Sequence, residues 1–273
     1  MNKLGVLFKL KSDNEVFEEM KKIKAIGCDC CQLTVWDMSL YTDEMAARVV
    51  EASKMSDVEI STLWAGWSGP TAWNFTEGPM VLGIVPTAYR MKRMEDLKLG
   101  IEFASKIGVS RVATHVGFLP ENINDPQYFD ILAALRYLAK ECQKYNINFL
   151  FETGQETPVT LLRYIEAIGM DNVGINMDTA NLLLYGKANP ADAITVFGKY
   201  VMDTHIKDGL YPTDGMKLGK EVKVGEGLAN IPEVVRRLKE VGYKGNYIIE
   251  REITGEQQQK DIVDTLAYLK TII

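Results

Sequence analysis

Short β-prone runs alternate with longer helix-period runs along all 273 residues, and this alternation limits the possible folds more than any other feature. The strand candidates occupy residues 3–10, 28–36, 58–67, 110–117, 147–154, 173–181, 201–209 and 245–252. A helix candidate follows each of them. Strict alternation is typical of a parallel sheet with helical crossovers. Eight such units in this length predict one (β/α)8 TIM barrel, as a single domain over residues 1–273.

The hydrophobic patterns within these units agree with a barrel. Several strand candidates are nearly continuous in apolar residues, as expected for strands that are buried on both faces. The helix near residues 127–145 carries Ile131, Leu135, Leu138 and Cys142 on one face. The first strand–helix junction, KLKSDN, lacks G-x-G-x-x-G, so nothing supports a dinucleotide-binding fold.

Composition excludes several classes of partner and location. The chain is 47% hydrophobic and 25% charged, which indicates a globular protein with a sizeable core. Its net charge of −6 argues against nucleic acid or an anionic membrane as the main partner. No apolar run approaches a transmembrane span, and the start does not resemble a secretory signal, so we expect a cytoplasmic protein. The four cysteines lack C-x-x-C spacing and are expected to be core thiols.

Ionisable residues follow apolar runs at the ends of the last four strand candidates. Glu152 follows FLF, Asp178 follows INM, Glu250 follows YII, and His205 lies in the seventh strand. Each residue alone has an ordinary explanation as an ion-pair partner, a helix cap or a core histidine. Their coincidence at the C-terminal ends of four strands, where barrel active sites lie, favours a metal site. A divalent cation would relieve the repulsion between three close carboxylates, and an O₃N donor set suits Mn²⁺, Mg²⁺, Co²⁺ or Zn²⁺.

Other residues near these strand ends are candidates for substrate contact. His115 lies near the end of the fourth strand candidate and Lys207 near the end of the seventh; a structural histidine and a surface or ion-paired lysine are the alternatives. The long loop 66–86 follows the third strand, and loops of that length are usually functional. Trp64 and Trp67 lie nearest the end of the third strand, and at least one of them is expected to form a wall for the substrate. A self-packed loop or an oligomer contact is the alternative for these aromatic residues.

A glycine-containing turn lies further along, in the stretch VGEG. Gly225 and Gly227 predict a tight turn before the helix that begins near residue 230. A phosphate site at this turn is a further possibility.

Five motifs together resemble a known family. FETG, NMDTANLL, THIKDG, KVGEG and YIIERE, in this order and spacing, resemble the sugar phosphate isomerase/epimerase family of xylose isomerase-like barrels, over almost the whole chain. The family includes ketose 3-epimerases, hydroxypyruvate isomerase, inosose dehydratase and isomerase, and endonuclease IV. The resemblance implies that Glu152, Asp178, His205 and Glu250 bind one divalent metal ion. It also implies that Glu152 and Glu250 are the catalytic acid/base pair.

Two departures from the family pattern matter. Asn181 stands where the family has a second histidine, three residues after the sixth-strand aspartate. Glu156 lies slightly before the position of a second glutamate in the ketose 3-epimerases. Both residues are expected to contact the substrate. The endonuclease IV branch uses three zinc ions and many histidines, which a chain with two histidines cannot supply.

The expected function is therefore a divalent-metal-dependent isomerase or epimerase of a ketose or related small sugar, free or phosphorylated. It would remove a proton next to a carbonyl and pass through an enediolate. The alternatives are an inosose-type dehydratase, an abasic-site endonuclease and a non-catalytic sugar-binding barrel. We expect a small-molecule sugar or sugar phosphate as partner, with no nucleic acid and no membrane, and a homodimer or homotetramer as in much of the family.

Overall fold

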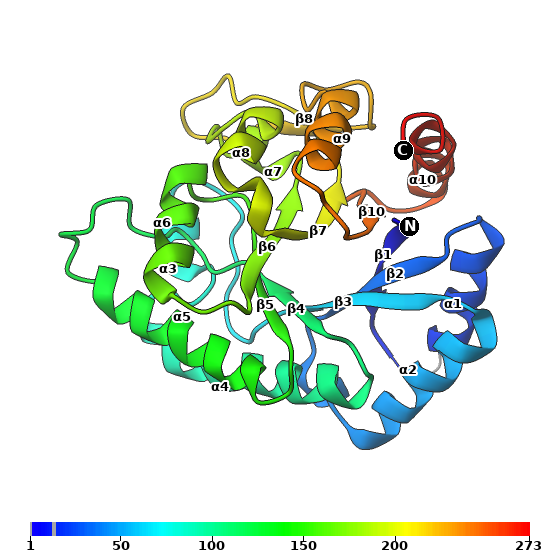
Figure 1. Cartoon of the computed structure of the whole chain (residues 1–273), viewed down its shortest axis with the longest axis horizontal. Helices are drawn as coiled ribbons and strands as arrows, with labels where there is room; N and C mark the ends of the chain where they lie inside the picture. The colour runs from blue at the N-terminus through cyan, green and yellow to red at the C-terminus, as the bar shows by residue number, and fades with distance from the viewer. Residues whose placement is uncertain (1, 13–14) are drawn as a thin grey trace.

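The computed structural model describes residues 2–12 and 15–273 and contains a closed barrel of eight parallel strands (Figure 1). Around the barrel the order is β1, β10, β7, β6, β5, β4, β3, β2. The strands are β1 (Leu4–Leu10), β2 (Cys30–Val35), β3 (Glu59–Ala65), β4 (Arg111–Thr114), β5 (Asn148–Glu152), β6 (Val173–Asp178), β7 (Val201–Ile206) and β10 (Tyr247–Ile249). The predicted (β/α)8 barrel is confirmed.

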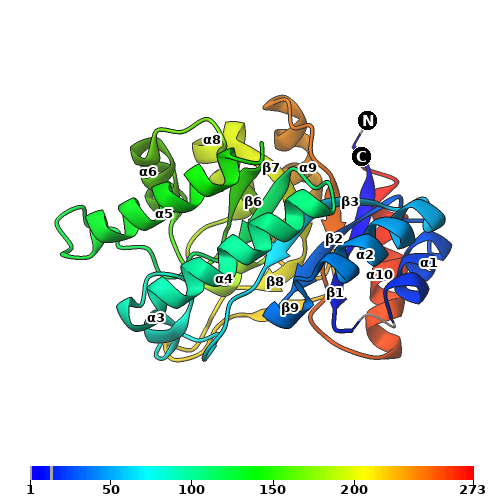
Figure 2. The same ribbon diagram turned by 90° about the horizontal axis from the view of Figure 1, so that it is seen from below.

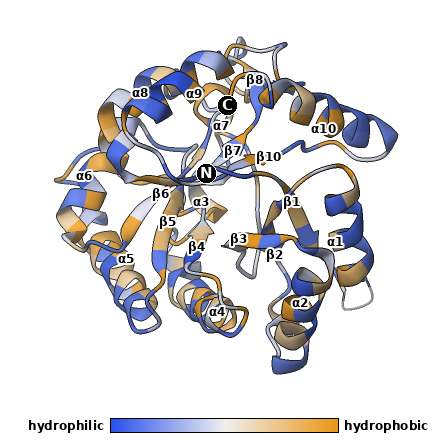
Figure 3. Cartoon of the chain, turned by 45° about the vertical axis from the view of Figure 1, so that its right-hand side comes forward, coloured by the Kyte–Doolittle hydropathy of each residue, from blue (hydrophilic) through white to orange (hydrophobic). Residues whose placement is uncertain are grey.

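Helices surround the strands, as the view in Figure 3 shows. The longer ones are α1 (Val16–Ala25), α2 (Asp43–Ser56), α4 (Thr87–Lys106), α5 (Tyr128–Gln143), α6 (Pro158–Ile168), α8 (Pro190–Phe197), α9 (Ile231–Glu240) and α10 (Glu256–Leu269). The short ones are α3 (Gly78–Val81), α7 (Asn181–Leu184) and the 3₁₀ turns η2 (Met38–Leu40) and η3 (Gly198–Tyr200). Among the described residues, no helix is long and apolar enough to cross a membrane.

The core lies between the strands and the inner faces of these helices. All six residues of β2 are buried, in agreement with a strand that is covered on both faces. On α5 the predicted apolar face is buried in full, from Ile131 to Cys142. All four cysteines are free and buried, as expected for core thiols.

The seventh strand is shorter than its sequence suggests. The predicted strand 201–209 ends at Ile206, and β8 (Asp208–Leu210) leaves the barrel to pair in antiparallel with β9 (Lys220–Val222). Only Lys207 separates β7 from β8, so the two strands were interpreted as one run, although Asp208 and Gly209 are poor strand formers. Figure 2 shows this hairpin at the same end of the barrel as α3.

Asp208 holds the loop that follows the hairpin. Its carboxylate accepts hydrogen bonds from the backbone amides of Gly209, Gly225, Gly227 and Ala229 at 2.8–3.1 Å. The loop around VGEG therefore wraps an internal carboxylate. Because these amides already have an anionic partner, they do not form the phosphate site that was the alternative for this turn.

Candidate metal centre and active site

Strand register brings the four predicted ligands together. In the ladder between β6 and β7, Asp178 is opposite His205, and β10 pairs with β7 on its other side. Glu152 ends β5, and Glu250 directly follows β10. Because parallel strands present their C-terminal ends at one rim of a barrel, all four side chains reach the same point. One donor atom from each residue lies within 4.8 Å of all the others.

His205 lies at the centre of this group. Its Nδ1 is 3.0 Å from Glu152 Oε1, 3.1 Å from Glu250 Oε2 and 3.7 Å from Asp178 Oδ2. The side chains of His205, Glu152 and Asp178 are almost fully buried, and that of Glu250 is 12% exposed. Three carboxylates therefore converge on one imidazole nitrogen with little access to water.

The donor atoms fit a divalent cation. Asp178 Oδ1 accepts bonds from the amides of Ala180 and Asn181, which turns Oδ2 towards the cluster. Asp178 Oδ2 and Glu250 Oε2 are buried and accept no hydrogen bond in the described part of the chain, although both lie within ion-pair distance of His205 and Lys207. A buried carboxylate oxygen that accepts no hydrogen bond is costly, and coordination to a hard cation removes that cost. One imidazole nitrogen and three carboxylates are donors that Mn²⁺, Mg²⁺, Co²⁺ and Zn²⁺ all accept.

Without a cation, the cluster holds protons instead. Burial raises the pKa of Glu250 to about 7, against the opposing effects of Lys207 and His205. Burial opposes the charged form of His205, but Glu152 and Glu250 outweigh it and raise the pKa of His205 well above its ordinary value. A metal ion requires an ionised carboxylate and a neutral imidazole, so its binding would release protons.

Lys207 lies inside the cluster and is not a surface residue. Its side chain is 1% exposed, and its Nζ lies 3.0 Å from Glu252 Oε2 and 3.6 Å from both Asp178 Oδ2 and Glu250 Oε2. It also donates a hydrogen bond of 3.2 Å to Asn181 Oδ1. Burial disfavours its charge, but these carboxylates raise the pKa of Lys207 well above its ordinary value. Lys207 therefore stays cationic at the edge of the site.

Glu152 is held from a second side by Trp64 and His115. Trp64 Nε1 donates a hydrogen bond to Glu152 Oε2, and His115 Nε2 lies 3.5 Å from Glu152 Oε1. Burial lowers the pKa of His115, which keeps its ring neutral at pH 7. Burial opposes the charge of Glu152, but the protonated rings of His115 and His205 outweigh it at acid pH and lower the pKa of Glu152.

All four tryptophans of the chain gather above this cluster. The ring of Trp36 lies 5.0 Å from that of Trp64, 5.3 Å from Trp67 and 6.4 Å from Trp73. Trp36, Trp64 and Trp73 line the cavity, whereas Trp67 is 2% exposed and packs behind them. Trp36 was missed by the sequence reasoning, although its place directly after a buried strand was a usable signal.

Arg93 of α4 fixes the loop that carries two of these rings. Its buried guanidinium donates hydrogen bonds of 2.6–3.1 Å to the carbonyl groups of Ser68, Pro70, Val81 and Gly83. It also lies 5.3 Å from the ring of Trp67. The loop 66–86 is thus tied at both ends to one cation, which no motif in the sequence indicated.

Asn181 and Glu156, both expected to contact the substrate, differ in whether they line the cavity. Asn181 lines it and accepts a hydrogen bond from Lys207, whereas Glu156 is not among the lining residues. Glu156 is 2% exposed, and neither of its carboxyl oxygens has a hydrogen-bond partner among the described residues. Burial raises the pKa of Glu156 to about 8, so its carboxyl group is largely protonated at pH 7.

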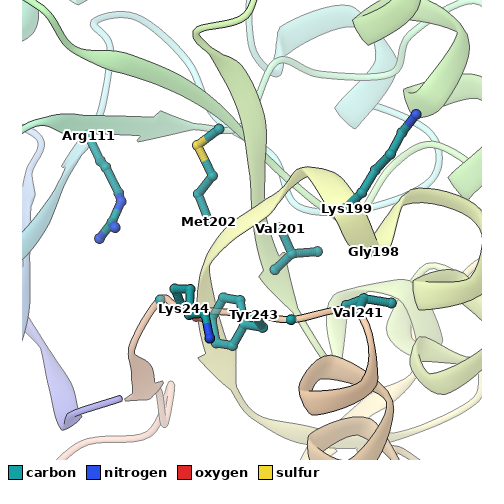
Figure 4. A pocket seen from close by; sticks show the side chains of 10 residues that line it. Arg111, Gly198, Lys199, Val201, Met202, Val241, Tyr243 and Lys244 are labelled. Atoms are coloured by element: carbon teal, nitrogen blue, oxygen red, sulfur yellow. The ribbon is translucent and has the colours of Figure 1, made fainter. Parts of the chain in front are cut away.

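The cluster opens into a cavity of about 1530 Å³, which extends along β1 towards α1 and α10. Glu152, His205 and Glu250 all line it. A smaller hollow of about 190 Å³ lies at the opposite end of the barrel, where Arg111, Met202 and Lys244 line it (Figure 4). That hollow contains none of the predicted site residues.

Comparison with known proteins gives a consistent family assignment. Residues 20–272 match the family described as xylose isomerase-like TIM barrel. The crystal structure of a xylose isomerase domain protein from Planctomyces limnophilus is 28% identical, with a TM-score of 0.92, over 98% of this chain and 96% of that chain. An uncharacterised protein of Methanocaldococcus jannaschii is 27% identical over 188 residues, or 64% of this chain. That match spans 62% of the relative, less than two thirds of its length.

Solved structures at lower identity share the fold. A D-tagatose 3-epimerase-like protein is 22% identical, with a TM-score of 0.75, over 99% of this chain and 96% of that chain. Others are a 3-keto-D-glucoside 4-epimerase from E. coli, a probable 3-DHS dehydratase from Bacillus anthracis and a protein from Mycobacterium smegmatis in complex with magnesium, which are 15–17% identical.

Proposed function

Because the chain belongs to the xylose isomerase-like TIM barrel family, we propose that it is a divalent-metal-dependent isomerase or epimerase of a ketose or related small sugar. One observation carries the proposal: a buried cluster of three carboxylates and one imidazole faces a large cavity. Epimerases among the proteins of the same fold support a sugar substrate by analogy.

The metal ligands would be Glu152, Asp178, His205 and Glu250. When bound, a divalent ion would act as a Lewis acid towards the carbonyl and neighbouring hydroxyl oxygens of the sugar. The magnesium complex of a protein with this fold supports a hard divalent ion. Among the described residues this is the only such group of histidine, cysteine and acidic side chains, which favours one ion for each chain.

Glu152 and Glu250 would transfer the proton. They come from β5 and β10, which β6 and β7 separate in the barrel, so the two carboxylates approach the cavity from different sides. A sugar between them would present its acidic carbon to one carboxylate and the opposite face to the other. One glutamate would remove the proton, and the other, or the same one, would return it.

The remaining residues would orient the sugar and keep water out. Lys207 would place a positive charge near the oxygen that becomes negative in the enediolate, and neutral His115 would donate a hydrogen bond. Asn181 would hold Lys207 in place through their hydrogen bond. Trp64 and Trp36 would stack against the apolar face of the sugar ring.

A lyase is the second candidate, and Glu156 favours it. A dehydratase removes the same type of proton and then expels a hydroxyl group, which requires an acid. The buried carboxyl group of Glu156 is four residues beyond Glu152 and keeps its proton at pH 7. It is not among the residues that line the cavity, so it would have to turn towards the sugar to supply that acid. The fold also occurs in a probable 3-DHS dehydratase.

One experiment separates these activities. The metal-loaded protein is incubated in D₂O with free and phosphorylated ketoses, and the products are followed by NMR and mass spectrometry. Deuterium in an isomeric sugar indicates an isomerase or epimerase, and loss of water indicates a lyase. Glu152→Gln and Glu250→Gln should each lose at least about 100-fold in exchange rate. Glu102→Gln, an exposed change on α4, is the control. Wild-type rates in both site variants would refute the proposal.

A further inference from the structure

A buried glutamine contacts the proposed metal ligand His205 from across the barrel. Gln32 lies on β2 and is fully buried. Its Oε1 is 2.5 Å from His205 Nε2. In the closed barrel, β1 and β10 separate β2 from β7, so this contact crosses the interior and is not a contact between neighbouring strands.

The orientation of the Gln32 amide is set by its other partners. Its Nε2 donates to Asn176 Oδ1 at 3.1 Å and lies 3.4 Å from Asp203 Oδ2. Asp203 Oδ2 in turn accepts hydrogen bonds from Ser61 Oγ at 2.9 Å and Thr62 Oγ1 at 2.6 Å. Rotating the Gln32 amide by half a turn would place its carbonyl oxygen against Asp203 Oδ2, a carboxylate acceptor that Ser61 and Thr62 hold in place whichever way the Asn176 amide points. The network therefore keeps Gln32 Oε1 towards the imidazole.

This orientation determines which imidazole nitrogen carries the hydrogen. A carbonyl oxygen only accepts, so His205 Nε2 must donate, and in the neutral ring Nδ1 then has a free electron pair. Nδ1 is the nitrogen that faces Glu152, Glu250 and Asp178. Metal-bound histidines characteristically donate their other N–H to a fixed acceptor, and that acceptor sets the ring orientation.

We propose that Gln32 is a positioning residue of the metal centre, which holds His205 in the Nε2–H tautomer with Nδ1 towards the ion. The inference rests on the metal centre proposed above. A glutamine inside the barrel does not follow from packing, because burying an amide is costly unless all its bonds are made. Here the Gln32 amide forms hydrogen bonds with both His205 and the buried polar network of Asn176 and Asp203.

The first test measures metal affinity. Calorimetry with Mn²⁺ at fixed pH compares the wild type with Gln32→Met, which keeps the length but lacks the acceptor, and Gln32→Glu, which keeps an acceptor. Gln32→Met should weaken Mn²⁺ binding about 10- to 100-fold, and Gln32→Glu should bind more tightly than Gln32→Met. The control is Ser53→Ala, which removes a 2.6 Å bond to Val58 O near the C-terminal end of α2, away from the site. Its affinity should equal that of the wild type.

The second test does not depend on a variant that folds. The chain has only two histidines, so ¹⁵N spectra of the wild type with Mg²⁺ or Zn²⁺ resolve both rings. His205 should show a protonated Nε2 and a metal-shifted Nδ1. A protonated Nδ1, or a Gln32→Met variant that binds Mn²⁺ as tightly as the wild type, would overturn the inference. Weaker Mn²⁺ binding by Gln32→Met supports the role of Gln32 even when no sugar reacts. The two proposals can therefore fail independently.

Discussion

Replacing Glu250 with glutamine should stabilise the metal-free protein at alkaline pH. Burial raises the pKa of Glu250 to about 7 from an ordinary value of 4.5. The unfolded carboxyl group therefore ionises before the folded one, and the folded state loses stability as the pH rises from about 4.5 to 7. The difference corresponds to about 3 kcal/mol of unfolding free energy above pH 7. Glu250→Gln removes this penalty because its amide does not ionise.

The assay is thermal and urea unfolding in EDTA at about pH 5 and pH 8. At pH 8 the Glu250→Gln protein should melt about 6–12 °C above the wild type, from about 2–4 °C for each kcal/mol in a protein of this size. At pH 5 most of this difference should vanish. Glu102→Gln, which is exposed on α4, should show no such dependence. Equal melting of the wild type and Glu250→Gln at both pH values would refute the reasoning.

Metal reduces the difference in stability between the wild type and Glu250→Gln. Mn²⁺ at a free concentration of 100 times its Kd should stabilise the wild type by about 2.7 kcal/mol, or about 5–10 °C. Glu250→Gln lacks one anionic ligand, so the same Mn²⁺ concentration should raise its Tm by less than half as much. An equal increase in both proteins would show that Glu250 does not bind the ion.

Three further outcomes are expected. Arg93→Met leaves four carbonyl groups without their donor, and that of Gly83 is fully buried, so urea unfolding should show a loss of at least about 2 kcal/mol with altered tryptophan emission. A loss below about 0.5 kcal/mol would show that Arg93 does not hold the loop 66–86. Lys207→Met removes the cation between Asp178, Glu250 and Glu252, so the free energy of unfolding in EDTA at pH 8 should fall by about 3 kcal/mol or more, and Mn²⁺ should restore part of this loss. An unchanged free energy of unfolding would show that the carboxylates need no cation. Chelation of the wild type should abolish deuterium exchange into the sugar and Mn²⁺ should restore it, whereas exchange that persists in EDTA would exclude a metal-dependent reaction.

Much of the site was predictable because barrel geometry converts position along the chain into position in space. Glu152, Asp178 and Glu250 each follow a buried strand, and parallel strands end at one rim. The sequence predicted where Lys207 lies but not its burial, because spacing cannot distinguish an exposed lysine from one that is 1% exposed among carboxylates. Trp67 was expected beside the substrate, but the fold places Trp36, from a different strand, at the cavity and Trp67 behind it.

The sequence by itself determined the barrel and the rim at which its polar residues gather, because both follow from local periodicity and from the residues that end each strand. Only the tertiary structure decided the contacts between distant strands. Gln32 meets His205 across 173 positions of sequence, and Arg93 closes the loop 66–86 over the site. Such contacts depend on how the barrel closes and which way each side chain points, and no local pattern records either.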